Sequence, residues 1–384
     1  MNLRKLRALD AAVLLWIAAP FIRLRFHYTC DSLKKEKGPY LLLCNHVTDL
    51  DPFFLSMACG APPRFVASEH ILRKGLGGKL LSRYGSLIVH TKGGGVGMRS
   101  AMEMIKSLRG GDRVGLFPEG NRCFNGVTGD IPAVTGKLMK SAGVKVITFR
   151  LEGGYFTQPR WGFGFRRGRM CGRIVHIYSP EELAAMTNEE ALAAVRRDLY
   201  EDAFAAQRAN PVSYRTKAPA EGLEAAVFAC PKCGGFGGLH TEGEKLFCDC
   251  GFSAVMDGFG FLHTGEEALT VFSLDMLQRE LLAKRIQTGG SAPLFYDRVC
   301  IRAISKEHTA DGEREAVLTL YPGYAELSGK RFTPEEISGA AIRSRNTLNI
   351  FTADGQQYEI TGGREFCALK YLYWYRIHKN EVLF

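Results

Sequence analysis

The feature that most constrains this chain is the stretch 41–54, LLLCNHVTDLDPFF. The apolar run Tyr40–Cys44 predicts a fully buried strand that ends just before His46. Asp51 comes five residues after the histidine and is followed by Pro52, which is a helix-start signal, so Asp51 is expected to cap a helix. A loop histidine that folds back onto a carboxylate has the arrangement of a general base.

This pattern alone leaves two interpretations of His46 open. The chain contains nine histidines, so one histidine five residues before an aspartate arises readily by chance. The second interpretation is a loop histidine that is hydrogen-bonded to a helix cap and has no chemical role. A further motif is therefore needed to separate the two.

A second motif follows the run Arg113–Phe117, which predicts another short strand. It reads Pro-Glu-Gly-Asn-Arg over residues 118–122. Gly120 lets the backbone approach a ligand, and the guanidinium of Arg122 can bind a phosphate through two parallel hydrogen bonds. Glu119 can hold Arg122 or accept a hydrogen bond from a ligand hydroxyl. Taken alone, this stretch is equally compatible with a tight turn and a surface ion pair.

Together the motifs resemble those of the glycerophospholipid acyltransferase family, of the lysophosphatidic acid acyltransferase type. That family carries N-H-x-x-x-x-D followed by F-P-E-G-T-R, and this chain has Asn45–Asp51 and Phe117–Arg122 in the same order. The resemblance covers roughly residues 20–190. It implies catalysis by His46 and Asp51. It also implies substrate-binding residues, namely Asn45, Lys92, Glu119, Gly120 and Arg122.

Two positions depart from the family's usual pattern. In G-x-I-x-V-x-R the family carries an arginine that helps to hold the acceptor phosphate, but this chain has Thr91 there, with Lys92 next. Lysine is a point charge that lacks the planar fork of arginine. Thr148 stands near a position where the family usually has proline. Both departures concern the acceptor and leave His46 and Asp51 unaffected.

Residues 27–207 alternate between strand and helix patterns, which predicts an α/β domain with a central sheet flanked by helices. The expected strands are Phe26–Thr29, Tyr40–Cys44, Arg64–Ala67, Leu87–Val89, Arg113–Phe117, Lys145–Leu151 and Gly172–Tyr178. The expected helices are Pro52–Cys59, Gly77–Tyr84, Met98–Leu108, Ala133–Ala142 and Glu181–Gln207. Because both motifs follow strands, His46 and Arg122 are expected to meet at one end of the sheet.

Residues 1–26 are the one candidate for membrane attachment in the sequence. Their apolar part is about fifteen residues long, fewer than the ~20 that a spanning helix needs, and basic residues flank it. This favours a helix at the membrane interface, with a buried core helix as the alternative. The eleven cysteines and the lack of a signal peptide favour a reducing compartment. We therefore expect a peripheral or monotopic protein on the cytoplasmic face.

A second constellation follows a polar stretch, residues 208–226, which reads as a linker. Residues 227–260 contain Cys230, Cys233, Cys248 and Cys250, in C-x-x-C-G and C-x-C-G turns. This pattern predicts a zinc ribbon, with free thiols as the alternative. Four thiolates fill a tetrahedral site, so Zn²⁺ is expected to be structural, and no cofactor is expected for catalysis. A segment this small needs the metal to stay folded.

Residues 261–384 predict a third module of short strands with a closing helix. An amphipathic helix is expected at Ser273–Ile286 and an aromatic-rich one at Glu365–Lys379. The expected strands are Ala316–Tyr321, Tyr324–Ser328, Lys330–Phe332, Gly339–Arg343, Thr347–Thr352 and Gln357–Ile360. The pattern resembles a pleckstrin-homology-like barrel, an α+β module that binds lipids or proteins.

The motifs therefore predict an O-acyltransferase that moves a fatty acyl group from acyl-CoA or acyl-carrier protein to a lysophospholipid or related lipid hydroxyl. Its partners would be membrane lipids and the acyl donor. The net charge of +10 also suits nucleic acid. The alternative is a non-catalytic protein whose zinc ribbon engages nucleic acid or a protein partner at the membrane. Nucleic acid is the less favoured partner, because the sequence shows neither RNA-binding aromatic motifs nor a basic helix.

Overall fold

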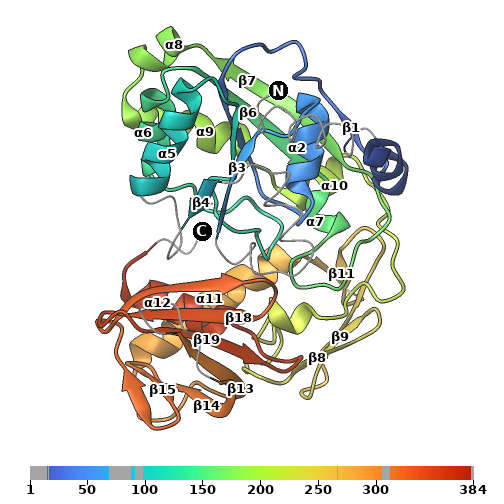
Figure 1. Cartoon of the computed structure of the whole chain (residues 1–384). Coiled ribbons are helices and arrows are strands. Elements are labelled where there is room, and N and C mark those ends of the chain that lie inside the picture. The colour runs from blue at the N-terminus through green and yellow to red at the C-terminus, as the bar shows by residue number, and fades with distance from the viewer. Residues whose placement is uncertain are drawn as a thin grey trace. The chain divides into compact units, whose positions relative to one another are not determined.

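The structure is a computed structural model that describes residues 15, 17–68, 88–90, 98–265, 267–304 and 312–381. The chain forms two compact units (Figure 1). The first unit consists of Met1–Cys123, Val127–Gln158 and Phe165–Tyr214, and the second of Phe124–Gly126, Pro159–Gly164 and Arg215–Phe384. The expected helix Gly77–Tyr84 lies outside the described residues, as do Thr91 and Lys92. In the part of the chain described, no helix has both the length and the apolar character needed to cross a membrane.

The first unit is built on a seven-stranded sheet in the order β1-β7-β6-β2-β5-β3-β4. The strands are β1 (Thr29–Cys30), β2 (Tyr40–Cys44), β3 (Arg64–Ser68), β4 (Ile88–His90), β5 (Val114–Leu116), β6 (Lys145–Glu152) and β7 (Cys171–Tyr178). From β6 to β4 all neighbours are parallel, whereas β7 runs antiparallel to β6. Because β2 and β5 are parallel neighbours, the two motifs leave the sheet at the same edge.

Helices cover both faces of this sheet. They are α2 (Asp51–Cys59), α5 (Met98–Arg109), α6 (Val134–Ser141), α7 (Gly154–Thr157), α8 (Pro180–Ala185), α9 (Asn188–Leu199) and α10 (Ala203–Ala209). Leu42 packs in one core cluster with Phe54 of α2, while Leu41 packs in another with Leu138 of α6 and Val195 of α9. Burial on both faces explains why β2 is a continuous apolar run. The expected α/β class is confirmed.

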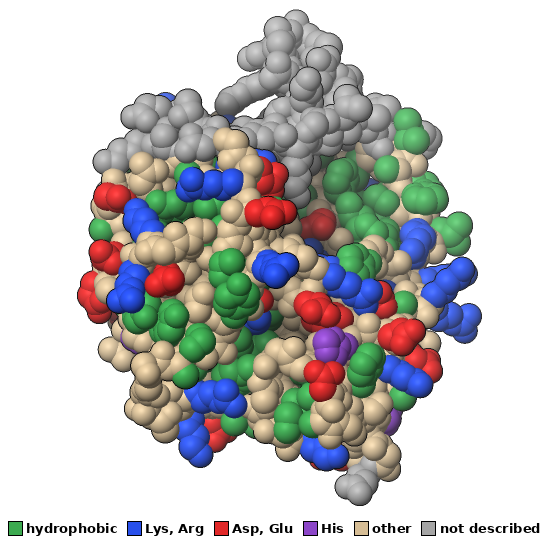
Figure 2. All heavy atoms as spheres, turned by 90° about the horizontal axis from the view of Figure 1, so that it is seen from below, with side chains coloured by type: hydrophobic (Ala, Val, Ile, Leu, Met, Phe, Trp, Pro, Cys, Tyr) green, Lys and Arg blue, Asp and Glu red, His purple; other side chains and the backbone are tan. Residues whose placement is uncertain are grey.

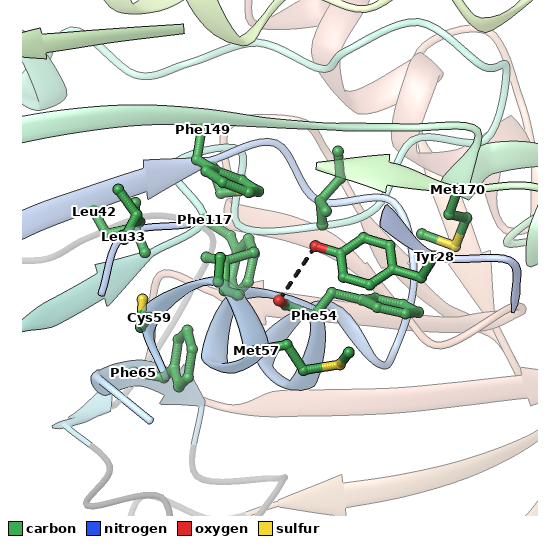
Figure 3. Packing of buried hydrophobic residues seen from close by; sticks show 14 of the residues in the cluster. Tyr28, Leu33, Leu42, Phe54, Met57, Cys59, Phe65, Phe117, Phe149 and Met170 are labelled. Atoms are coloured by element: carbon green, nitrogen blue, oxygen red, sulfur yellow. Dashed lines mark hydrogen bonds between the residues drawn. The ribbon is translucent and has the colours of Figure 1, made fainter. Parts of the chain in front are cut away.

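The cluster on the α2 side also contains Phe117, the first residue of the second motif. Figure 3 shows its ring lying over α2 in the cluster that includes Leu42 and Phe149. The hydroxyl of Tyr28 donates to the carbonyl of Phe54 at 3.3 Å and fixes the first turn of α2 to this core. The start of α2 is thus anchored where the first motif ends.

Two expected elements of the first unit are wrong in their extent. Residues 17–26 are helical, so the expected strand Phe26–Thr29 shrinks to β1, because Phe26 packs into the core and His27, at φ +44°, ends the helix. The expected helix Glu181–Gln207 is three helices. Thr187 caps α9 by accepting from the amide of Glu190, and Asp202 caps α10 in the same manner. Each capping residue begins a new helix, so the expected single helix is divided into three.

The helix 17–26 has two apolar faces. Ile22 and Phe26 belong to the core cluster. Ile17, Phe21 and Leu24 are 61%, 70% and 73% exposed. Positions i, i+4 and i+7 lie on one side of a helix, so these three residues form an exposed apolar stripe. The helix is therefore a core element on one side and an unburied apolar surface on the other.

The second unit contains two antiparallel sheets. The five-stranded sheet, in the order β12-β11-β10-β9-β8, consists of β8 (Leu239–Glu242), β9 (Lys245–Cys248), β10 (Ser253–Met256), β11 (Leu262–His263) and β12 (Ala268–Leu269). The segment that precedes this sheet in the chain was expected to be a linker, but part of it is buried, namely Ala220, Ala226 and the short helix η1 (Leu223–Ala225). The helix α11 (Val271–Thr288) follows and is longer than expected.

The other sheet has seven strands in the order β16-β15-β14-β13-β19-β18-β17. They are β13 (Phe295–Ile304), β14 (Arg314–Leu320), β15 (Ala325–Leu327), β16 (Lys330–Phe332), β17 (Ile337–Arg343), β18 (Thr347–Thr352) and β19 (Gln357–Gly362), followed by α12 (Leu369–His378). The long strand β13 was missed by the sequence analysis, because charged residues interrupt its apolar alternation. Among the described residues the pairings form an open series, and not the closed ring of a barrel.

A buried polar network crosses the second unit around Asp275 of α11, which is 1% exposed. Its carboxylate accepts from the side-chain amides of Asn125 and Gln278, both at 2.8 Å, and from the hydroxyl of Tyr373 at 2.7 Å. It also forms an ion pair with Arg279. A buried charge with this many partners is a strong structural constraint.

Candidate active site

The histidine of the first motif is held by its aspartate. The Nδ1 atom of His46 lies 2.7 Å from Oδ2 of Asp51. The aspartate side chain is fully buried, while that of the histidine is 23% exposed. Because an ionised carboxylate only accepts hydrogen bonds, Nδ1 carries the proton and Nε2 of the neutral ring is left as an acceptor. This is the tautomer that a general base requires.

Asp51 does not cap α2, contrary to expectation. The cap position is Leu50, and Asp51 is the first residue of the helix, with its side chain turned back to the loop. There its carboxylate accepts from the amides of Val47 at 2.7 Å and Thr48 at 2.9 Å, and from the Thr48 hydroxyl at 2.6 Å. The loop thus supplies donors to both oxygens of the carboxylate. The contacts fix the loop that carries His46.

The ring of Phe117 is in contact with the imidazole of His46. Its ring stacks on that of His46 with centroids 4.6 Å apart and an interplanar angle of 24°. Phe65 of β3 stacks against Phe117 in turn, at 6.0 Å and 7°. The orientation of the imidazole is thus set by the hydrophobic core. Phe117 was predicted only as part of a motif, because the sequence does not show that β5 lies next to β2.

Glu119 joins the two motifs through the backbone. Its Oε1 accepts from the amide of His46 and its Oε2 from the amide of Gly129, both at 2.7 Å. Burial raises the pKa of Glu119 to about 8, against the lowering effect of these two amides, and nearby Asp51 raises it further. The structure therefore places this carboxyl on the backbone of the first motif, where it positions His46.

Asn45 lies in the interior and not on the surface of the site. Its side chain is fully buried and bonds both backbone groups of Leu151, at 2.7 Å and 2.9 Å. It also donates to Glu201 at 3.2 Å, and burial raises the pKa of Glu201 to about 8. Asn45 thus ties the motif to β6 and does not present its side chain to a substrate. Glu201 was missed, because a contact across 156 positions leaves no local pattern in the sequence.

Gly120 and Arg122 close the second motif. Gly120 adopts φ +70° in a turn closed by its own amide on the carbonyl of Phe117, so glycine is required by the backbone conformation. Arg122 is 11% exposed on its side chain, and its Nη1 donates to the backbone carbonyl of Gln158 at 3.0 Å. Its Nη2 lies 3.4 Å from Oδ1 of Asp49. The guanidinium therefore lies beside the loop of the first motif.

Asp49 and Gln158 form a pair that the sequence analysis missed. The amide of Asp49 donates to Oε1 of Gln158 at 2.8 Å, and Nε2 of Gln158 donates to Oδ2 of Asp49 at 2.9 Å. Asp49 occupies one of the variable positions of the first motif, so the motif alone gives it no role.

The four cysteines of the second unit lie together. Their sulfur atoms are all within 4.8 Å of one another, with Cys230 to Cys250 at 3.6 Å and Cys233 to Cys248 at 4.0 Å. A tetrahedral ion with bonds of 2.3 Å places its ligands about 3.8 Å apart, so the cluster fits one metal ion. The amide of Gly235 donates to Sγ of Cys233 at 3.4 Å, which stabilises a thiolate.

A comparison with protein-family models agrees with the two motifs. Residues 25–152 match the family model described as Acyltransferase, and this stretch contains both motifs. A search of curated proteins gave no match. Among solved structures, the crystal structure of the 1-acyl-sn-glycerophosphate (LPA) acyltransferase PlsC from Thermotoga maritima is similar, with 20% identity and a TM-score of 0.41. The alignment covers 52% of this chain and 82% of that one.

Proposed function

From the premise that residues 25–152 form a domain of the acyltransferase family, we propose that the protein is a lipid O-acyltransferase. It moves a fatty acyl group from acyl-CoA or acyl-carrier protein to the hydroxyl of a lysophospholipid or related lipid. The observation that carries the proposal is the buried Asp51 on Nδ1 of a partly exposed His46, at the sheet edge where the second motif begins.

The geometry supports a direct transfer. Nε2 of His46 accepts the proton of the acceptor hydroxyl while the hydroxyl oxygen attacks the thioester carbonyl. The tetrahedral intermediate collapses, the carbon–sulfur bond breaks, and the leaving sulfur takes the proton from the imidazolium. Asp51 keeps the proton on Nδ1 throughout and stabilises the positive ring. No acylated side chain is needed.

The remaining motif residues fall into two groups. Gly120, Arg122 and Lys92 are assigned to the acceptor, because a flexible backbone and positive charges suit a lipid headgroup. Asn45 and Glu119 are positioning residues, since their side chains bond backbone groups that hold His46.

The direct test measures thioester consumption and lipid products with purified protein, both acyl donors and a panel of lysolipids. We expect turnover by the natural sequence and a loss of about 10²–10⁴-fold in His46→Ala, the usual effect of removing a general base. His176→Ala is the matched control, because His176 also contacts a carboxylate, Glu182 at 3.1 Å, but on the surface. Absence of product with every acceptor, or normal turnover by folded His46→Ala, would refute the proposal.

For the second unit we propose a structural Zn²⁺ held by Cys230, Cys233, Cys248 and Cys250. Four thiolates leave no open coordination position, so the ion would stabilise the fold and take no part in the reaction. Metal analysis should find one zinc per chain, none in the double variant Cys230→Ser/Cys233→Ser, and one in the control Cys300→Ser. Zinc retained by the double variant would contradict the assignment.

We also propose peripheral attachment to the cytoplasmic face of a membrane through the apolar stripe of helix 17–26. Its three exposed apolar residues would bury in the interfacial region, and apolar burial is not screened by salt. Vesicle sedimentation in high salt should detect binding that Phe21→Ser/Leu24→Ser weakens. Tyr296→Ser is the control, since Tyr296 is 63% exposed in the second unit. Equal binding by all three proteins would exclude the stripe.

The alternative, a non-catalytic protein that binds nucleic acid, has less support. On the face shown in Figure 2, lysine and arginine side chains are interspersed with aspartate and glutamate. Nucleic-acid-binding surfaces gather one sign of charge into a patch or stripe. The thioester assay separates the two functions, because only the acyltransferase consumes the donor.

A further inference from the structure

We infer that Asp49 selects the acceptor, so that the site favours a headgroup carrying an amine beside its phosphate over a bare phosphomonoester. The inference rests on the proposed acyl transfer and names the acceptor class for that site. It starts from the ion pair between Asp49 and Arg122, two residues that come from the two motif loops.

The guanidinium of Arg122 already interacts with groups of the protein. One guanidinium nitrogen donates to the carbonyl of Gln158 at 3.0 Å and another lies 3.4 Å from Asp49. Because 3.4 Å is longer than a usual charged hydrogen bond, Asp49 acts on the guanidinium mainly through its charge. Any anionic headgroup that contacts Arg122 must therefore do so beside a carboxylate.

The position of Asp49 is fixed. Gln158 bonds both its amide and its carboxylate, at 2.8 Å and 2.9 Å, so the side chain cannot turn away when a ligand arrives. The carboxylate is nevertheless 66% exposed, which leaves it open to a ligand. A fixed, exposed negative charge therefore lies on the loop that carries His46, three residues further along the chain.

The charges of the pair favour one class of acceptor. A phosphomonoester carries about −1.5 to −2 at neutral pH, so Asp49 repels it while Arg122 attracts it. A headgroup with a phosphodiester and an ammonium places its negative group on Arg122 and its positive group on Asp49. Repulsion of the wrong ligand is as effective for specificity as attraction of the right one.

The experiment compares lysophosphatidylethanolamine with lysophosphatidic acid of the same acyl chain. The natural protein should show the higher kcat/KM with the ethanolamine lipid. Asp49→Asn keeps the shape and the contacts to Gln158 but removes the charge, so it should shift the kcat/KM ratio about fivefold towards the phosphomonoester, mainly through KM. The shift should shrink at high ionic strength, which a merely structural role of Asp49 would not produce.

Asp130→Asn is the matched control, because Asp130 is also an exposed partner of an arginine, Arg196 at 2.7 Å, in the same unit. It should leave the ratio unchanged. A preference of the natural protein for lysophosphatidic acid, or an unchanged ratio in Asp49→Asn, would overturn the inference while leaving the acyltransferase intact.

A binding measurement separates this inference from the proposed function. Titration with sn-glycerol 3-phosphate and with glycerophosphoethanolamine needs no acyl transfer. Asp49→Asn should bind glycerol 3-phosphate more tightly than the natural protein does. If no acceptor is acylated but this difference appears, the proposed function fails and the selectivity of Asp49 stands; equal binding by the two proteins overturns the inference.

Discussion

Two buried aspartates, Asp51 in the first unit and Asp275 in the second, differ in what surrounds them. They are 0% and 1% exposed, and each accepts several hydrogen bonds. The partners of Asp275 are all buried themselves, and its charge is balanced by Arg279, which stays protonated at any accessible pH. One partner of Asp51 is the imidazole of His46, whose side chain is 23% exposed.

In the proposed mechanism, this difference explains why Asp51 would support the reaction and Asp275 only the fold. A buried carboxylate cannot act on a substrate by itself, so it needs a partner that both reaches the surface and changes its protonation. Asp51 has such a partner and Asp275 does not. Exchanging each aspartate for asparagine should therefore produce opposite phenotypes.

The largest effect is expected for Asp51→Asn. The asparagine amide would donate to Nδ1 of His46 and stabilise the other tautomer, which carries its proton on Nε2 and cannot accept one. We expect kcat to fall about 10³–10⁴-fold, as the same exchange does in serine proteases. The loss of stability should be smaller than in Asp275→Asn, because the amide of Val47 loses its acceptor but no buried cation loses its countercharge. A kcat within tenfold of the natural protein would remove Asp51 from the mechanism.

Asp275→Asn should do the reverse. It leaves Arg279 buried without its countercharge, which costs about 3 kcal/mol in the unfolding of the second unit. The kcat of the molecules that remain folded should stay unchanged. Denaturant unfolding measures the loss of stability. Glu326→Gln is the control, since Glu326 forms an exposed pair with Arg331 at 3.5 Å, and such pairs contribute at most about 1 kcal/mol. A loss no larger than that of the control would show that the network is not needed for stability.

The same contrast explains what the sequence could predict. The buried strand β2, the helix α2 and the pair His46 and Asp51 are local features, set by apolar runs, a proline and a spacing of five residues. The four cysteines were predicted because metal ligands come in short turns. At these positions the structure agrees with the local pattern.

Contacts between distant segments could not be predicted in this way. The role of Asp275 could not be predicted because its partner Asn125 is 150 positions away. The contact of Glu201 with Asn45 could not be predicted either, because it spans 156 positions. The break before α9 is a different case, because Thr187 and Glu190 form a capping box that can be recognised in the sequence. One long apolar periodicity outweighed that signal in the prediction of a single helix.

A third type of buried carboxyl is predicted to make stability depend on pH. Among the described residues, the carboxyl groups of Glu119 and Glu201 accept from neutral amides, those of His46 and Gly129 in one case and of Asn45 and Gly153 in the other. Burial raises the pKa of each from 4.5 to about 8, so the folded protein binds more protons than the unfolded chain between these values. Stability should therefore fall as pH rises from about 4.5 to 8 and level off above that.

Each group contributes a slope of at most about 1.4 kcal/mol per pH unit. Melting temperatures measured across this range should decline for the natural protein, and the decline should flatten in Glu119→Gln/Glu201→Gln. Glu103→Gln is the control, because Glu103 is exposed on α5. The comparison with Asp51 is direct, since its partner His46 reaches the surface, whereas these glutamates bond backbone and side-chain amides. If the melting temperature of the double variant declines as steeply as that of the natural protein, other titratable groups cause the decline. The two glutamates would then be charged in the folded protein across this pH range.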